Sequence, residues 1–239
     1  MTTRKSIMLS GLIAALCAAL PTLAAPLTVA SGSTLTLDFN GFYNNTTIPG
    51  LTGEVTLSNF VFTSTTVGGQ AATKVTMNYL IENTSLFPVI LTSRISNFAF
   101  DTTPTILTTG LNQVTGTYDT VVINANQPNG IGTVEVCFTA ANCPGGGSGG
   151  VWTGDSGGGA ATLYFSGNIS SFTLDNAVLR YQSVSCIIGS PCNSSASGVI
   201  TASTGGGAPG GQVPEPSTYA LMSLGIAGIA FLSRHTRRG

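Results

Sequence analysis

The residues that come closest to a catalytic motif are Gly154–Gly158, with the sequence Gly-Asp-Ser-Gly-Gly around a potential nucleophile, Ser156. Such a serine needs a base to take its proton and an acid to orient that base. The only histidine in the chain is His235, close to the carboxyl end, in a segment that the residues below place across a membrane from Ser156. We therefore expect no proteolytic activity, and no histidine-based metal site in the exported part.

Carboxylates suggest two further chemistries. Glycoside hydrolysis needs two carboxyl groups about 5–10 Å apart, and calcium needs several oxygen ligands close together. The acidic residues, however, occur singly along the sequence: Asp38, Glu54, Glu82, Asp101, Asp119, Glu135, Asp155 and Asp175. We expect no catalytic residue, no cofactor and no metal site, with a hydrolase and a calcium ion near Asp155 or Asp175 as weaker alternatives.

The cysteines form two windows of equal spacing, Cys137 with Cys143 and Cys186 with Cys192. An even number of cysteines in an exported protein favours disulfides. Each window brackets turn-forming residues, so the first prediction is one local disulfide in each window. Bridges between the windows remain an alternative, and a zinc site is disfavoured by an oxidising compartment and by the wide spacing.

The amino-terminal residues are typical of a secretory signal peptide, predicted over 1–24. Arg4 and Lys5 precede the apolar segment Ile7–Leu20, and small residues follow at the positions that signal peptidase reads. Cleavage after Ala24 is the first choice, because cleavage after Ala25 would leave a proline as the first residue.

The carboxyl-terminal tail, 213–239, combines three elements in a fixed order. Pro214, Glu215 and Pro216 come first, an apolar run over about 217–232 follows, and a basic cluster ends the chain: Arg234, Arg237 and Arg238. As a helix the run would be roughly 24 Å long at about 1.5 Å per residue, somewhat shorter than a bilayer core of about 30 Å. Snorkelling arginines and local thinning accommodate such a mismatch. We predict a transmembrane helix with the arginines on the cytoplasmic side.

This order resembles the carboxyl-terminal sorting signal of PEP-CTERM proteins of Gram-negative bacteria. The resemblance implies that a membrane-embedded exosortase recognises and processes the tail. It also implies that the body is first held in the periplasm at the inner membrane, and then reaches the cell surface or extracellular matrix. The paired cysteine windows and the Gly-rich insert are similar to those of the cistern-family subgroup.

The exported part between 25 and 216 is acidic and poor in charge. It keeps only Lys74, Arg94 and Arg180 against all nine Asp and Glu residues, a net charge of −6. A nucleic-acid-binding surface requires a basic patch, so we expect no nucleic-acid partner.

Alternating apolar and polar residues predict strand after strand, most clearly over Val75–Glu82. We predict an all-β, antiparallel β-sandwich of jelly-roll type over 25–193. The residues Ser171–Val184 resemble the last two strands of jelly-roll domains in PEP-CTERM proteins and carbohydrate-binding modules, with a turn at Asp175–Asn176. The Gly-rich segments predict a mobile loop over Pro144–Ala160 and a flexible linker over 194–212.

Three classes of function follow. The first is a non-catalytic surface or matrix protein linked to extracellular polysaccharide, and it accounts for both targeting segments. The second is a carbohydrate-binding module, which needs exposed aromatic side chains on one face. The candidates for that role are Tyr43, Tyr118, Trp152, Tyr164 and Tyr181. The third is a secreted hydrolase.

Overall fold

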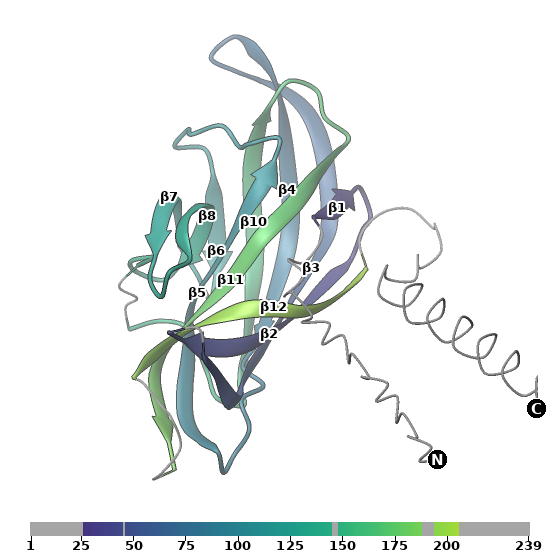
Figure 1. Ribbon diagram of the computed structural model, residues 1–239. Coiled ribbons are helices and arrows are strands. Elements are labelled where there is room, and N and C mark those ends of the chain that lie inside the picture. Colours follow the sequence, from purple (N-terminus) through teal and green to yellow (C-terminus); the bar gives the residue numbers. More distant parts are fainter. Residues whose placement is uncertain (1–25, 45, 145–147, 188–193, 206–239) are drawn as a thin grey trace, which may run out of the picture.

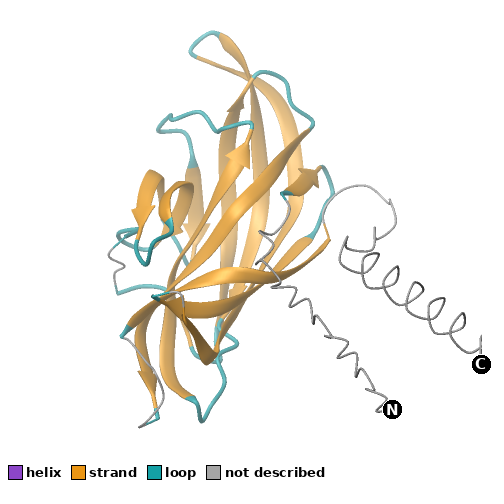
Figure 2. Cartoon of the chain, in the orientation of Figure 1, coloured by secondary structure: helices purple, strands orange, loops and turns teal. Residues whose placement is uncertain are grey.

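The computed structural model describes residues 26–44, 46–144, 148–187 and 194–205, which form strands joined by turns and loops. The all-β prediction is confirmed, since every regular element in this part of the chain is a strand (Figure 2). No helix of the described residues is long and apolar enough to span a bilayer. The strands are β1 (Leu27–Ala30), β2 (Leu35–Tyr43), β3 (Thr46–Val67), β4 (Gln70–Glu82), β5 (Ile90–Thr103), β6 (Gln113–Gly116), β7 (Thr120–Gln127), β8 (Gly132–Thr139), β9 (Val151–Trp152), β10 (Ser156–Ser166), β11 (Ser171–Cys186) and β12 (Ser195–Gly205).

All strands belong to one antiparallel sheet. Its order is β6-β10-β4-β3-β2-β12-β11-β5-β8-β7, with β1 added beside β11 and β9 added beside β5. The long strands β3, β4, β10 and β11 run along the molecule, while the β7–β8 hairpin curls away at the left of the view (Figure 1). The predicted jelly-roll sandwich is not confirmed, because β12 hydrogen-bonds to β2 on one side and to β11 on the other and so joins the described strands into one sheet.

The strands follow the alternation of the sequence. In β2, Leu35, Leu37 and Phe39 are buried while the residues between them are only partly covered. In β4, Val75 and Tyr79 are likewise buried. Because side chains point alternately to the two faces of a strand, this pattern buries one face of the sheet and leaves the other nearer to solvent.

Aromatic contacts show that the sheet folds over on itself. Phe39 of β2 packs edge-on against Phe98 of β5, with ring centres 6.4 Å apart. Tyr79 of β4 lies 6.0 Å from Phe138 of β8 and stacks 5.9 Å from Tyr118. Neither β2 and β5 nor β4 and β8 are neighbours in the sheet, so the contacts place the β4–β2 half against the β11–β8 half around a common core.

Two predicted loop regions are strands instead. The predicted linker over 194–212 is wrong over Ser195–Gly205, because these residues form β12 in the interior of the sheet. The predicted loop Pro144–Ala160 is also too long, since it contains β9 and β10 begins at Ser156. Composition misled the prediction in both places: small residues are favoured in linkers, but they also allow backbones to approach closely.

The predicted turn at Asp175–Asn176 is a bulge within one continuous strand, β11. The register with β5 shifts between Asp175 and Val178, and Asn176 has a φ of 46°. A bulge bends a strand without ending it, so the two predicted strands of this region are a single strand.

Cys137 and Cys143 form a disulfide, as predicted, with their Cα atoms 6.2 Å apart. Both lie in a second, smaller core on the outer face of the sheet, with Ala99, Ala125 and Val134. Cys186 is also disulfide-bonded. Its predicted partner, Cys192, lies outside the described residues.

Gly159 offers a test of the close packing in the Gly-rich part of β10. A Cβ atom placed there would overlap the carbonyl oxygen of Thr115 on β6. We expect Gly159→Ala to lower the free energy of unfolding by about 2 kcal/mol or more, because neither backbone can yield without breaking the β6–β10 pairing. Urea unfolding measures this.

The matched control is Gly110→Ala, where an added Cβ meets no atom within 4 Å and φ is ordinary. Equal stabilities of the two variants would show that β6 and β10 are not packed as described.

Candidate functional site

Three consecutive strands place a tryptophan, an arginine and a glutamine in one row on the outer face of the sheet. Arg94 of β5 is the register partner of Trp152 on β9 and of Gln182 on β11. Its guanidinium carbon lies 5.5 Å from the centre of the indole ring, which is a cation–π distance. On its other side, Arg94 Nη2 donates a hydrogen bond of 2.8 Å to Gln182 Oε1.

A second arginine lies in the next row of the same face. Arg180 of β11 is the register partner of Asn97 on β5 and of Ser197 on β12. Its Nη1 donates to the carbonyl oxygen of Ala196 at 3.3 Å. We call the two rows the arginine face, comprising Arg94, Asn97, Trp152, Arg180, Gln182 and Ser197.

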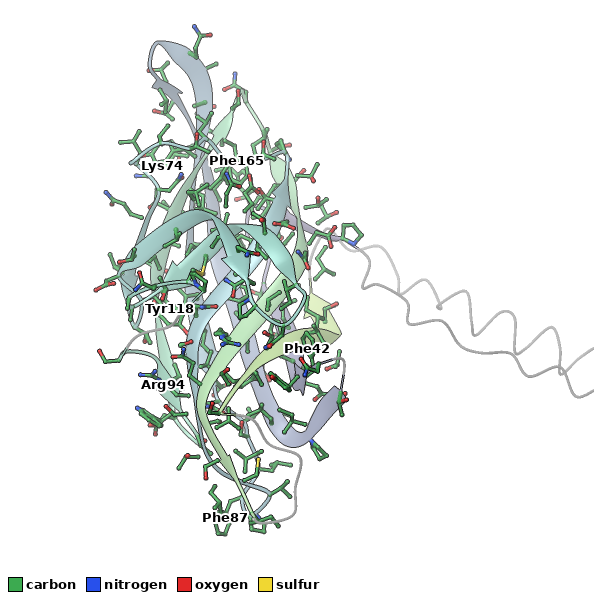
Figure 3. The ribbon with its side chains drawn as sticks, turned by 60° about the vertical axis from the view of Figure 1, so that its left-hand side comes forward. Phe42, Lys74, Phe87, Arg94, Tyr118 and Phe165 are labelled. Carbon is green, nitrogen blue, oxygen red and sulfur yellow. A yellow bond between two sulfur atoms is a disulfide. The ribbon has the colours of Figure 1, made fainter. Side chains whose placement is uncertain are left out.

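The second row is covered, whereas the first row reaches solvent. Asn129, from the β7–β8 turn, donates to Ser197 Oγ at 3.0 Å. Asn97 Nδ2 donates to the carbonyl oxygen of Cys143, next to the disulfide. Asn97 and Ser197 are fully buried, but Trp152 is 45% exposed. Trp152 is therefore the point at which the arginine face meets solvent. Figure 3 shows Arg94 at the left of the view, in the lower half of the molecule.

The arginine face carries positive charge without a negative partner. Both arginines are only 7% exposed, yet neither makes an ion pair with any carboxylate of the described residues. Burial lowers the pKa of Arg180 below its ordinary value, because desolvation disfavours the charged form. Arg94 Nε, Arg180 Nε and Asn97 Oδ1 are also buried without a hydrogen-bond partner.

Trp152 owes its position to a buried polar network behind β9. Asn83 Nδ2 donates to the carbonyl oxygen of Val151 at 3.1 Å and to Ser93 Oγ at 3.1 Å. The backbone of Thr153 and the backbone of Ser93 are joined by a hydrogen bond of 3.0 Å. These bonds, together with the pairing to β5 and the buried side chain of Val151, fix the two-residue strand and hold the indole beside Arg94.

A row of acidic side chains crosses a different part of the outer face. Asp38 of β2 is the register partner of Glu54 on β3, which is the partner of Glu82 on β4, and Ser156 on β10 follows. We call Asp38, Glu54 and Glu82 the carboxylate row. Like charges directly opposite each other destabilise a sheet. The pKa of Glu54 is raised, first by desolvation and then by Glu82 and Asp38.

The carboxylate row was not predicted from the sequence, because its residues lie far apart in the chain and become neighbours only through strand register. It places Ser156 beside an acid, Glu82, whereas His235 lies outside the described residues. No group of three or more metal-ligating side chains that could hold an ion occurs among the described residues.

The aromatic candidates for sugar binding do not share one exposed face. Tyr118 and Tyr181 are fully buried in the core, and Tyr43 and Tyr164 are partly covered. Trp152 alone of the five is exposed, as expected from its position. Arg180 lies in the interior of the sheet, because β11 has a neighbour on each side, and it is buried without a carboxylate partner among the described residues.

Several predicted site residues lie outside the described residues. These are the signal cleavage positions Ala24 and Ala25, the motif Pro214, Glu215 and Pro216, and the basic cluster Arg234, Arg237 and Arg238. Comparison with known families reaches the last two groups. Residues 212–238 match the family model of the PEP-CTERM protein-sorting motif. The chain carries a PEP-CTERM sorting signal.

The sorting motif shows that this is an exported protein, directed to the cell envelope or surface, with exosortase as its processing partner. The match covers the tail and not the folded body. No curated protein and no solved structure matches the chain. The arginine face and the carboxylate row therefore have to be interpreted from their own chemistry.

The raised pKa of Glu54 leads to a prediction of how stability depends on pH. Because its pKa in the folded protein lies above the ordinary value of 4.5, the folded state binds the proton more tightly than the unfolded state. The free energy of unfolding then falls as pH rises from below 4.5 through the raised pKa. We expect Glu54→Gln to remove this fall and to be the more stable protein at pH 7.

Thermal unfolding between about pH 4 and 8 measures the effect. Asp119→Asn is the control, because Asp119 is exposed and lies outside the strands, with no carboxylate in register. A parallel pH profile of Glu54→Gln and wild type would contradict the repulsion within the carboxylate row.

The burial of Arg180 without a carboxylate partner among the described residues leads us to expect that its replacement stabilises the protein. Replacing an unpaired buried charge by an apolar side chain of similar length removes a desolvation cost. We expect Arg180→Met to raise the free energy of unfolding by about 1 kcal/mol, as measured in urea. Lys74→Met, at a partly covered lysine of β4, is the control and should not stabilise the protein. Destabilisation by Arg180→Met would mean that the charge is compensated in the native protein.

Proposed function

We propose that the protein is a non-catalytic component of the cell surface or extracellular matrix, associated with extracellular polysaccharide. The tail first anchors the body at the inner membrane, facing the periplasm, and exosortase processing then delivers the body outward. The observation that carries this proposal is the sorting motif over residues 212–238. Assignment to the cistern-family subgroup remains a prediction.

The outer face of the sheet supports a structural role. Along β2 and β3, Thr36 and Thr56 face each other with their hydroxyl oxygens 3.2 Å apart, and Thr52 Oγ1 donates to the carbonyl oxygen of Thr84 at 2.8 Å. Hydroxyl groups of this kind solvate a surface without charge. The body combines this surface with a disulfide and an aromatic core, as suits a protein that acts outside the cell.

A secreted hydrolase is the second candidate, and the carboxylate row favours it. Side chains directly opposite on neighbouring strands have Cβ atoms about 5 Å apart, which is compatible with a retaining glycosidase. The test is whether the protein releases reducing ends from a polysaccharide. If it does, and if Glu54→Gln and Glu82→Gln each abolish the release, the hydrolase replaces the structural proposal.

The sorting motif predicts the fate of a variant. We expect the double substitution Pro214→Ala and Pro216→Ala to abolish processing, because alanine, unlike proline, leaves φ free and adds a backbone donor at each position. The full-length tail should then remain on the protein in the envelope fraction. Intact-mass spectrometry of envelope and medium fractions distinguishes the two forms.

Pro209→Ala is the matched control, since this proline lies just before the matched residues 212–238. Processing of the double variant at the wild-type rate would contradict recognition of the Pro-Glu-Pro motif.

A further inference from the structure

We propose that the first row of the arginine face, where Trp152 is exposed beside the buried Arg94 and the partly covered Gln182, binds a carboxylate-bearing sugar of an acidic polysaccharide. The inference rests on the proposed function and names the ligand chemistry that the body recognises. Trp152 provides the surface for the sugar ring, and Arg94 and Gln182 provide the polar contacts.

The first step is the charge of the site. The exported part has only three basic residues, and two of them, Arg94 and Arg180, lie on the arginine face. Both are 7% exposed and lack a carboxylate partner among the described residues. A buried cation that the protein does not neutralise favours an anionic ligand.

The second step is the polar geometry. Arg94 uses Nη2 for Gln182 Oε1, and its buried Nε has no hydrogen-bond partner. A guanidinium offers five N–H donors in a planar fork that matches a carboxylate. Arg94 is held on one side by Gln182 and on the other by the indole of Trp152. This fork is therefore oriented before any ligand arrives, which reduces the entropy cost of binding.

The third step is the aromatic surface. Trp152 is 45% exposed although Arg94 packs against its ring, and the network around Asn83 holds its strand in place. A fixed, half-exposed indole beside polar side chains suits a ligand with an apolar C–H face and polar substituents, as a pyranose ring has. A uronic acid combines such a ring with a carboxylate and so carries both features.

Polymer binding by the full chain, purified in mild detergent, tests the proposal. Trp152 is the only tryptophan, so its fluorescence reports on this site alone. We expect polygalacturonate to change the emission in a saturable manner. Methyl-esterified polygalacturonate, with the same ring but no charge, and polyglutamate, with the charge but no ring, should each bind at least tenfold more weakly.

Affinity electrophoresis in polygalacturonate gels compares variants without relying on fluorescence. Trp152→Ala and Gln182→Ala should reduce retardation at least tenfold, and Arg94→Lys, which keeps the charge but loses the planar fork, should do the same. The control is Phe87→Ala, at a side chain 77% exposed on the lower tip in Figure 3, away from Arg94. Its retardation should equal that of wild type.

Urea unfolding midpoints verify that each variant is folded. If Arg94→Lys does not fold, Gln182→Ala still tests the polar contacts of the site. Absence of retardation of the wild type overturns the proposal, as does equal binding of the esterified polymer or of polyglutamate. Normal processing and export of Trp152→Ala would leave the sorting function intact, so the two proposals fail separately.

Discussion

The pairing of β12 with β2 and β11 holds the two halves of this fold together. The sheet order places β12 between the strands of the β10–β2 half and those of the β11–β7 half, so it joins them by hydrogen bonds as well as by the core. The join depends on small side chains. A Cβ atom at Gly198 would lie 2.8 Å from the ring of Tyr181 and 3.3 Å from Phe39. The aromatic core reaches this strand because glycine leaves room for it.

The central position of β12 also links the body to its tail. This strand ends at Gly205, and the sorting motif begins at residue 212. The six residues between them can span at most about 20 Å when fully extended. Processing at the motif would therefore leave all twelve described strands with the body.

Two groups of charged residues on the outer face are arranged in ways that lower the stability of the folded protein. In the carboxylate row, Asp38, Glu54 and Glu82 face one another across neighbouring strands. On the arginine face, two buried guanidinium groups make no ion pair with a carboxylate in the part of the chain that the structure describes. The two groups have opposite charges and do not neutralise each other. An uncompensated charge in a folded protein costs free energy, so its presence directs attention to ligand binding, and the exposed indole of Trp152 indicates where a ligand would have access.

The sequence by itself determined the sorting signal and the all-β fold class of this protein. Pro214, Glu215 and Pro216, the apolar run and the terminal arginines are recognisable locally, because a sorting signal acts as a short linear segment. Alternation with a period of two likewise identified strands such as Val75–Glu82, and the short spacing of Cys137 and Cys143 gave the disulfide. Register, however, is a relation between distant residues. Only the tertiary structure brought Trp152, Arg94 and Gln182 into one row and turned Ser195–Gly205 into a central strand, because backbone pairing and core packing, which composition does not encode, decide which residues become neighbours.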